Sequence, residues 1–189
     1  MGRSSGRLFL GDEMKVIGIC GSPRKGNTEF LLREALKAAE EKGAETELIL
    51  LREKRIEFCD GCSKCEKTGI CHIIDDMQEV YEKLEEADAI ILGSPNYYDN
   101  VSGLMKNFID RTLVYYSLRE NKIKGKKGGI IAVGGGSADE AFEKMEVFFS
   151  AYGIKLIGGV KAIAGSASEI PKNKKAVKEV RKLGMKLVE

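Results

Sequence analysis

The chain lacks any long apolar run and carries almost no excess of charge of one sign. Its longest stretch without a charged residue is residues 128–138, eleven in number, whereas a membrane-spanning helix needs about 18 or more. Its 31 basic and 29 acidic residues nearly cancel, which leaves a formal net charge of +2. The sequence therefore argues against a membrane span, and it predicts neither nucleic-acid nor membrane partners.

The first residues also lack the apolar core of a secretory signal. Only residues 8–10 are continuously apolar, and this run is too short for that role, so we expect a cytoplasmic protein. Residues 1–13 show no periodicity, and we interpret them as a disordered tag or a misassigned start that precedes Met14. Residues 14–189 have the length and the hydrophobic content of a single globular domain.

Apolar segments alternate with amphipathic segments from Met14 onward. The continuously apolar segments predict strands covered on both faces, and the segments with apolar residues at i, i+3, i+4 and i+7 predict helices. We expect Asn27 or Thr28 to cap the first helix and Gly43 to close it. The expected strands are 16–20, 46–51, 89–93, 130–133 and 154–163, and the later helices are 76–87, about 104–113, 139–151 and 171–188.

This alternation predicts parallel strands joined by right-handed crossovers, and hence an α/β doubly wound three-layer sandwich. With five strands, we expect the flavodoxin-like order 2-1-3-4-5 and a cysteine-rich loop after strand 2, from Arg52 to about Asp75. Ligands bind such sheets at the carboxyl ends of the strands, where the strand order reverses. The loops after strands 1, 3 and 4 are therefore the candidate binding loops.

The loop after strand 1, residues 21–28, leads small and hydroxyl-bearing residues into a helix N-terminus. The free N–H groups and the positive end of the helix dipole attract anions there. Ser22 and Thr28 add hydroxyl donors, and Arg24 can neutralise a phosphate. The loop matches neither the dinucleotide nor the triphosphate motif, so a monophosphate fits best. The alternative is an ordinary strand-to-helix turn.

The loop after strand 3, residues 94–102, suits a flat ring. Pro95 restricts the turn, and Tyr97 or Tyr98 offers an aromatic face, although both tyrosines in a packing role is the alternative. The loop after strand 4, residues 134–137, contains three glycines that permit close approach of a ligand to the backbone. A phosphate loop and a ring loop on one sheet edge favour flavin mononucleotide (FMN).

Four cysteines form a compact C-x2-C-x2-C-x5-C run at Cys59, Cys62, Cys65 and Cys71. Such close spacing favours a [4Fe-4S] cluster, as in bacterial ferredoxin runs, although the last spacing is longer and His72 replaces the usual proline. Zinc and free or disulfide-forming thiols are the alternatives.

Two other residues, His72 and Cys20, are expected to have no direct role in binding a cofactor. We interpret His72, the only histidine, as a solvated loop residue, with a hydrogen bond to a sulfur or a proton relay as the alternatives. We expect Cys20, at the end of strand 1, to be buried packing.

Together these segments resemble an iron-sulfur flavoprotein of the flavodoxin-like NADPH-dependent FMN reductase superfamily. The resemblance covers essentially all of residues 14–189. The loops at 21–28 and 94–98 specify the superfamily, and the four-cysteine run specifies the iron-sulfur branch. The motifs that carry the resemblance are residues 21–28, 59–71, 75–77 (Asp-Asp-Met), 94–98 and 106–111 (Lys-Asn-Phe-Ile-Asp-Arg).

The resemblance implies one FMN and one [4Fe-4S] cluster per subunit, with the four cysteines as cluster ligands, and a homodimer or homotetramer with the flavin near a subunit interface. It assigns three loops to the FMN phosphate, to the ring and to the far edge of the ring, and it assigns no catalytic side chain. The residues assigned to FMN are Ser22, Arg24, Asn27, Thr28, Pro95, Asn96, Tyr97, Tyr98, Asn100, Val101, Gly134, Gly135, Gly136 and Ser137.

The expected function is electron transfer between a one-electron, ferredoxin-like donor and a small-molecule or protein acceptor. The first alternative is an NAD(P)H-dependent FMN or quinone reductase with zinc or no metal at the cysteines, although no NAD(P)H site can be matched in the sequence. The second is a structural or regulatory module in which zinc holds the loop together and the sheet edge binds a partner. Because strand 2 borders strand 1, we also expect the cysteine loop to emerge beside the phosphate and ring loops.

Overall fold

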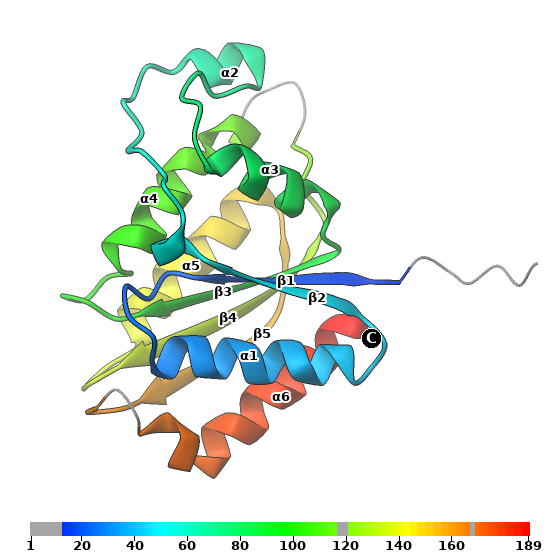
Figure 1. The fold of residues 1–189 in the computed structure, drawn as a ribbon, viewed down its shortest axis with the longest axis vertical. Coiled ribbons are helices and arrows are strands. Elements are labelled where there is room, and N and C mark those ends of the chain that lie inside the picture. Colours follow the sequence, from blue (N-terminus) through cyan, green and yellow to red (C-terminus); the bar gives the residue numbers. More distant parts are fainter. Residues whose placement is uncertain (1–12, 117–120, 167–168) are drawn as a thin grey trace, which may run out of the picture.

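The computed structural model describes residues 13–116, 121–166 and 169–189, so nearly all of the expected N-terminal tag lies outside the described residues. A five-stranded sheet forms the middle layer (Figure 1). Every neighbouring pair is parallel, and the order β2-β1-β3-β4-β5 confirms the sequence-based prediction. The strands are β1 (Lys15–Cys20), β2 (Glu45–Leu50), β3 (Ala89–Pro95), β4 (Lys127–Gly134) and β5 (Lys155–Ile163).

Helices cover both faces of the sheet, which confirms the three-layer sandwich. Figure 1 shows α1 (Asn27–Glu40) and α6 (Lys174–Val188) on one face. The other face carries α3 (Met77–Glu86), α4 (Gly103–Arg111) and α5 (Asp139–Tyr152). Short helices complete the chain: α2 (Lys64–Thr68) and the 3-10 turns η1 (Leu51–Glu53), η2 (Thr112–Tyr116) and η3 (Ile170–Lys172). No helix in the described ranges is long and apolar enough to cross a membrane.

Two helix boundaries differ from the expected ones for local reasons. The last helix starts at Lys174 instead of Pro171, because the Asn173 side chain caps it by accepting a hydrogen bond from the N–H of Ala176 at 3.1 Å. The helix expected to end near Leu113 is α-helical only to Arg111 and then tightens into η2.

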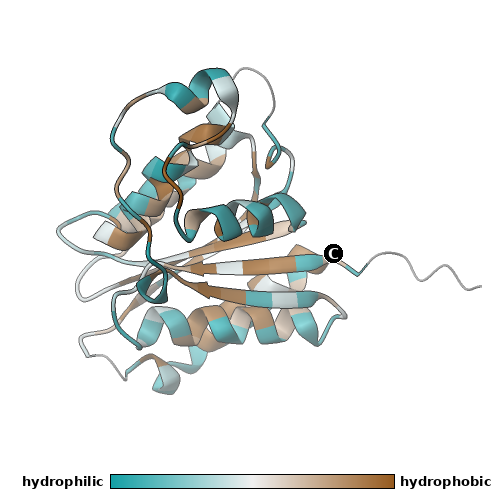
Figure 2. Ribbon diagram, turned by 45° about the horizontal axis from the view of Figure 1, so that its top comes forward, coloured by the Kyte–Doolittle hydropathy of each residue, from teal (hydrophilic) through white to brown (hydrophobic). Residues whose placement is uncertain are grey.

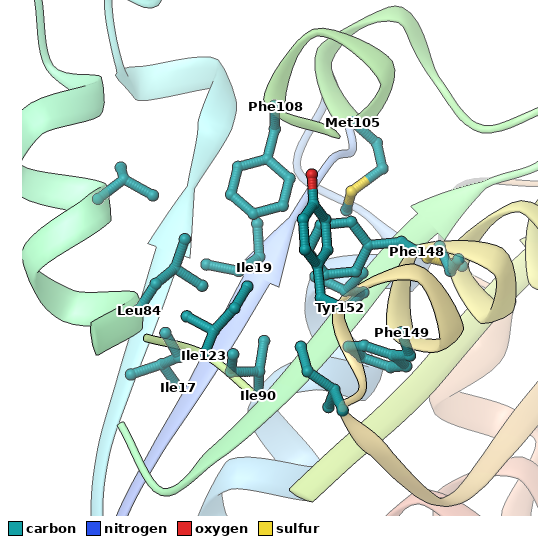
Figure 3. Close-up of a cluster of buried hydrophobic side chains, with 14 of the residues drawn as sticks. Ile17, Ile19, Leu84, Ile90, Met105, Phe108, Ile123, Phe148, Phe149 and Tyr152 are labelled. Atoms are coloured by element: carbon teal, nitrogen blue, oxygen red, sulfur yellow. The ribbon is translucent and has the colours of Figure 1, made fainter. Parts of the chain in front are cut away.

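Alternate residues of the central strands enter two separate cores, one on each face. On β3, Ile90 and Leu92 pack toward α3, α4 and α5, whereas Ala89 and Ile91 pack toward α1 and α6. The strands accordingly form the hydrophobic centre of the molecule (Figure 2). Figure 3 shows the first core, where the side chains of Ile19 and Phe108 lie beside the aromatic residues of α5.

The second core depends on a close approach between α1 and α6. A Cβ atom on Gly184 of α6 would lie 1.9 Å from the main-chain oxygen of Ala35 on α1. A contact this short with a backbone atom cannot be relieved by a rotamer change. Gly184 therefore sets the distance between the two helices, and through it the position of α1.

We expect Gly184→Ala to lower the free energy of unfolding by about 3 kcal/mol, because overpacking outweighs the helix propensity that alanine adds. Chemical denaturation of the variant measures this loss. Gly103→Ala is the matched control, since a Cβ atom there would meet nothing within 4 Å. Equal stability of the two variants would contradict the close-packing argument.

Candidate functional site

An open pocket joins the loops that follow β1, β3 and β4, at the carboxyl edge of the sheet. It brings together nine of the residues assigned to FMN from the sequence: Ser22, Arg24, Asn27, Thr28, Pro95, Asn96, Tyr97, Gly134 and Gly135. The pocket also includes Val133 and Ala164, which the sequence analysis missed. The other five assigned residues, Tyr98, Asn100, Val101, Gly136 and Ser137, belong to the same loops but do not line the pocket.

The side of the pocket that we expect to bind the phosphate is the N-terminus of α1. The expectation of an Asn27 or Thr28 cap was wrong, because Gly26 is the N-cap and no side chain among the described residues caps the helix. The Ser22 hydroxyl instead donates to the main-chain oxygen of Arg24 at 2.7 Å and shapes the loop. The first-turn N–H groups of α1 therefore lack a side-chain acceptor, and an anion would supply one.

Both ends of the Asn27 side-chain amide form hydrogen bonds within the protein. Its Nδ2 donates to the main-chain oxygen of Ser166 at 2.6 Å, and its Oδ1 accepts from the N–H of Ile170 at 3.3 Å. Asn27 therefore ties the segment after β5 to the start of α1. This leaves Asn27 its backbone N–H for a ligand.

The side of the pocket that we expect to meet the flavin ring is a tight turn after β3. Tyr97 and Asn100 exchange backbone hydrogen bonds of 2.8 and 3.1 Å. The two residues between them, Tyr98 and Asp99, both have positive φ, at 49° and 55°. Tyr98 is fully exposed at the tip of this turn, so its ring packs against nothing in the described chain. The packing interpretation therefore fails for Tyr98.

The side-chain amide of Asn96 has hydrogen-bond partners at its nitrogen but none at its oxygen among the described residues. Its Nδ2 donates to the main-chain oxygen of Ser137 at 3.0 Å and to Oε2 of Glu140 at 3.1 Å. Its Oδ1 is buried and finds no partner in the described part of the chain. A buried acceptor of this kind needs an N–H or O–H donor, and a flavin ring carries an N–H group on its polar edge.

Glu140 is a contact of this site that the sequence analysis missed. Hydrogen bonds from its own backbone N–H and from the Ser137 hydroxyl lower the pKa of its carboxyl group, so it is ionised beside Asn96. The sequence feature that could have pointed to Glu140 is the Ser-x-x-Glu spacing of residues 137–140, which is typical of a capping box.

The cysteine segment forms a separate lobe, defined here as residues 57–73. Its helix α2 packs against η2, at the far side of the molecule from α1 and α6 (Figure 1). None of its residues lines the pocket. The expectation that the cysteine loop emerges beside the phosphate and ring loops is therefore not met within one chain, because the loop leaves the sheet edge and crosses over α4.

The four cysteines of the lobe are free, and the other three lie close enough to Cys65 to affect its pKa. Cys65 is buried, whereas Cys59 and Cys62 are exposed and Cys71 is half-buried. Burial raises the pKa of Cys65, and negative charge on Cys71, Cys59 and Cys62 raises it further. A site that stabilises the thiolate of Cys65 therefore needs positive charge from outside the cysteines, which a metal centre supplies.

The spacing of the sulfurs bears on which centre fits. In a single zinc site with four thiolates, Zn–S bonds of about 2.3 Å place the sulfurs about 3.8 Å apart. In the described part of the chain, three metal-ligating atoms within 4.8 Å of one another occur only at Asp60, Cys62 and His72. In this structure no three of the four cysteine sulfurs lie as close together as a bound zinc ion would require.

The structure also shows the surroundings of His72 and Cys20. Nε2 of His72 lies 2.9 Å from Oδ2 of Asp60, whose Oδ1 accepts from the N–H of Cys62 at 3.1 Å. His72 is therefore exposed but anchored, not simply solvated. Cys20 is fully buried, and burial raises its pKa to about 11, which confirms its packing role.

Gly134 provides a test of the pocket. A Cβ atom there would lie 1.5 Å from the main-chain oxygen of Ser137, so alanine would force the loop open. We expect Gly134→Ala to weaken FMN binding about tenfold or more, since a 1.4 kcal/mol loss corresponds to a factor of ten. Fluorescence titration with FMN measures it. Gly165→Ala, where a Cβ would meet only one side-chain atom at 3.6 Å, should bind FMN normally, and equal binding by both variants would contradict the assignment.

Comparison with known proteins agrees with this geometry. Residues 14–169 match the model of the NADPH-dependent FMN reductase family. An iron-sulfur flavoprotein of Methanocaldococcus jannaschii is 44% identical over 150 residues, which cover 77% of this chain and 76% of the relative. An iron-sulfur flavoprotein of Archaeoglobus fulgidus is 41% identical over 182 residues, which cover 93% of this chain and 80% of the relative.

Among solved structures, an NAD(P)H:quinone oxidoreductase from Methanothermobacter marburgensis superposes with a TM-score of 0.70. The match covers 94% of this chain and 98% of that one at 18% identity, so it supports the fold alone. An archaeal flavodoxin superposes with a TM-score of 0.65 at 22% identity, over 93% of this chain and 96% of that one. The chain therefore belongs to the iron-sulfur flavoproteins of the NADPH-dependent FMN reductase family, and it is an FMN-dependent oxidoreductase.

Proposed function

We propose that this flavoprotein transfers electrons between a one-electron, ferredoxin-like donor and an acceptor, with a [4Fe-4S] cluster held by Cys59, Cys62, Cys65 and Cys71. The observation that carries the proposal is the presence on one chain of two separate sites, an anion-binding pocket and a four-cysteine lobe. When bound, FMN stores one or two electrons and the cluster carries them singly.

The pocket residues would bind and orient FMN. The first-turn N–H groups of α1 and the hydroxyl of Thr28 would donate to the phosphate, and the exposed Arg24 would balance its charge. On the ring side, Asn96 presents its unpartnered acceptor. Its other end is fixed by the ionised Glu140, so the amide cannot reverse without placing its oxygen against a carboxylate.

The assembly would bring the two sites together. The lobe lies away from the pocket of its own chain, so direct exchange requires the pocket of a neighbouring subunit. Four large apolar side chains are exposed on or beside the lobe: Phe58, Ile70, Ile74 and Tyr116. Large apolar side chains exposed on one part of a protein favour an interface there, which supports a homodimer or homotetramer.

We expect Arg24→Ala and Thr28→Ala each to weaken FMN binding about tenfold or more, because a hydrogen bond to a charged group contributes about 1.5–3 kcal/mol. The iron content should not change, since the cysteines lie on a different lobe. Equilibrium dialysis and iron analysis measure the two quantities. Lys37→Ala, in the last turn of the same helix, is the control, and loss of iron in step with flavin would contradict the separation of the sites.

The experiment that tests the proposed function starts from protein purified without oxygen. We expect acid release of FMN, about four iron and four sulfide per chain, and a broad visible absorbance that bleaches on reduction. Cys65→Ala should keep FMN but lose the cluster and reduction by a ferredoxin-type donor, while chemical reduction of its flavin persists. Cys20→Ala, which changes a buried cysteine outside the lobe, should keep both.

Two outcomes would count against the proposal. Stoichiometric zinc in the native lobe would favour the NAD(P)H-dependent FMN or quinone reductase. Reduction of Cys65→Ala by the ferredoxin-type donor at the wild-type rate would show that the lobe is not the entry point for electrons.

A further inference from the structure

Two segments singled out by the sequence, residues 75–77 and 106–111, have no part in the pocket or in the cysteine run. They meet in a buried ion pair between Arg111, the last residue of α4, and Asp75. The side chain of Arg111 is 0% exposed and that of Asp75 is 3% exposed. Nη1 and Nη2 of the guanidinium reach the two carboxylate oxygens at 2.6 and 3.1 Å, so the pair is bidentate.

The same two side chains bind the main chain on both sides of the cysteine run. Arg111 donates to the oxygen of Glu57 at 2.7 Å and to the oxygen of Ile73 at 3.4 Å. Asp75 accepts from the N–H of Glu57 at 2.8 Å. Glu57 lies two residues before Cys59, and Ile73 lies two residues after Cys71. The ion pair therefore joins the two ends of the lobe at its base.

Neighbouring contacts extend this closure outward from the lobe. Asn107, one helical turn before Arg111, donates to the main-chain oxygen of Ile56 at 3.0 Å. Asp76 accepts from the N–H of Arg55 at 2.7 Å, and its own N–H donates to the oxygen of Arg55 at 3.2 Å. The segment that leads into the lobe, at Arg55 and Ile56, is thus hydrogen-bonded to α4 and to the residue before α3.

Within the lobe itself, the hydrogen bonds of Cys62 and Thr68 are local, and a longer link joins His72 to Asp60. Cys62 N–H bonds to Asp60, and the Thr68 hydroxyl bonds to the main chain of Lys64 and Ile70. Only Cys65 of the four ligands is buried. The lobe buries few of its own side chains, so its position on the protein depends on how its two ends are held.

We propose that Arg111 and Asp75 are positioning residues that close the base of the lobe and thereby preset the spacing of the four cysteine sulfurs before a metal centre binds. The inference rests on the proposed cluster site. Arginine suits this task because its planar fork can satisfy a carboxylate and two carbonyls at once, whereas lysine offers one compact charge. The chemical class of the ligand is a thiolate-bound metal centre.

The test uses the full chain loaded with FMN and freed of iron, with its thiols reduced, and Co²⁺ as the probe. Cobalt bound by four thiolates has a strong charge-transfer absorbance, and its ligand-field bands report whether the site is tetrahedral. We expect Arg111→Lys and Asp75→Asn each to weaken Co²⁺ binding at least tenfold and to change these bands. Affinity for FMN should stay within twofold of the wild type. Arg111→Lys keeps the positive charge but loses the planar guanidinium. Asp75→Asn keeps the shape of the side chain but loses the carboxylate charge. A loss of binding in both variants would therefore show that the bidentate ion pair itself is required.

Lys106→Gln is the matched control, because it breaks the exposed Lys106–Asp110 pair on the same helix without touching the lobe. It should bind Co²⁺ as the wild type does. Wild-type Co²⁺ affinity and spectra in both Arg111→Lys and Asp75→Asn would overturn the inference. So would a parallel loss of FMN and Co²⁺ binding in both variants, since that would show a general structural role.

A second measurement on reconstituted protein separates this inference from the proposed function. Cluster loss after addition of a chelator should be at least tenfold faster in Arg111→Lys than in Lys106→Gln. If the wild type binds Co²⁺ but forms no [4Fe-4S] cluster on reconstitution, the proposed cluster is wrong, and the Co²⁺ comparison still decides the role of the ion pair.

Discussion

The buried Arg111–Asp75 pair is the interaction on which the arrangement of the cysteine lobe depends. Removing two charges from water costs several kcal/mol per ion, and an ion pair offsets this only when its other hydrogen-bonding groups are satisfied. Here the main chain on both sides of the lobe supplies most of those partners, and the buried Nε of Arg111 finds none among the described residues. A hydrophobic pair of the same volume would fill the space but would leave these carbonyl and N–H groups without partners.

Helix α4 connects this lobe to the flavin pocket. At its N-terminus, the Ser102 hydroxyl accepts from the N–H of Met105 as the cap and donates to the main-chain oxygen of Gly21, at the start of the phosphate loop. At its C-terminus, Arg111 holds the lobe. Nine residues of α-helix measure about 13 Å. The two sites therefore contact opposite ends of the same helix, and a shift of α4 along its axis would move both.

The sequence predicted the sheet and its pocket because their signals are local. Buried parallel strands appear as continuous apolar runs, and the strand order then determines which loops converge. The lobe was harder to place, since its direction depends on a contact between Asp75 and Arg111, 36 residues apart. The cap of α1 was also mispredicted. Asn27 has the right side chain for a cap, but Ser166 and Ile170 engage it instead, and no local pattern reveals that competition.

The turn at Tyr98 and Asp99 has a consequence for how the ring loop meets a flat ligand. Left-handed backbone costs most residues other than glycine roughly 1–2 kcal/mol, and aspartate tolerates it better than tyrosine does. Tyr98 and Asp99 both adopt it, held by the paired hydrogen bonds of Tyr97 and Asn100. The strain is thus stored during folding. A ring that enters the pocket meets a turn already in its final shape, and the entropy of ordering that turn is not lost again on binding.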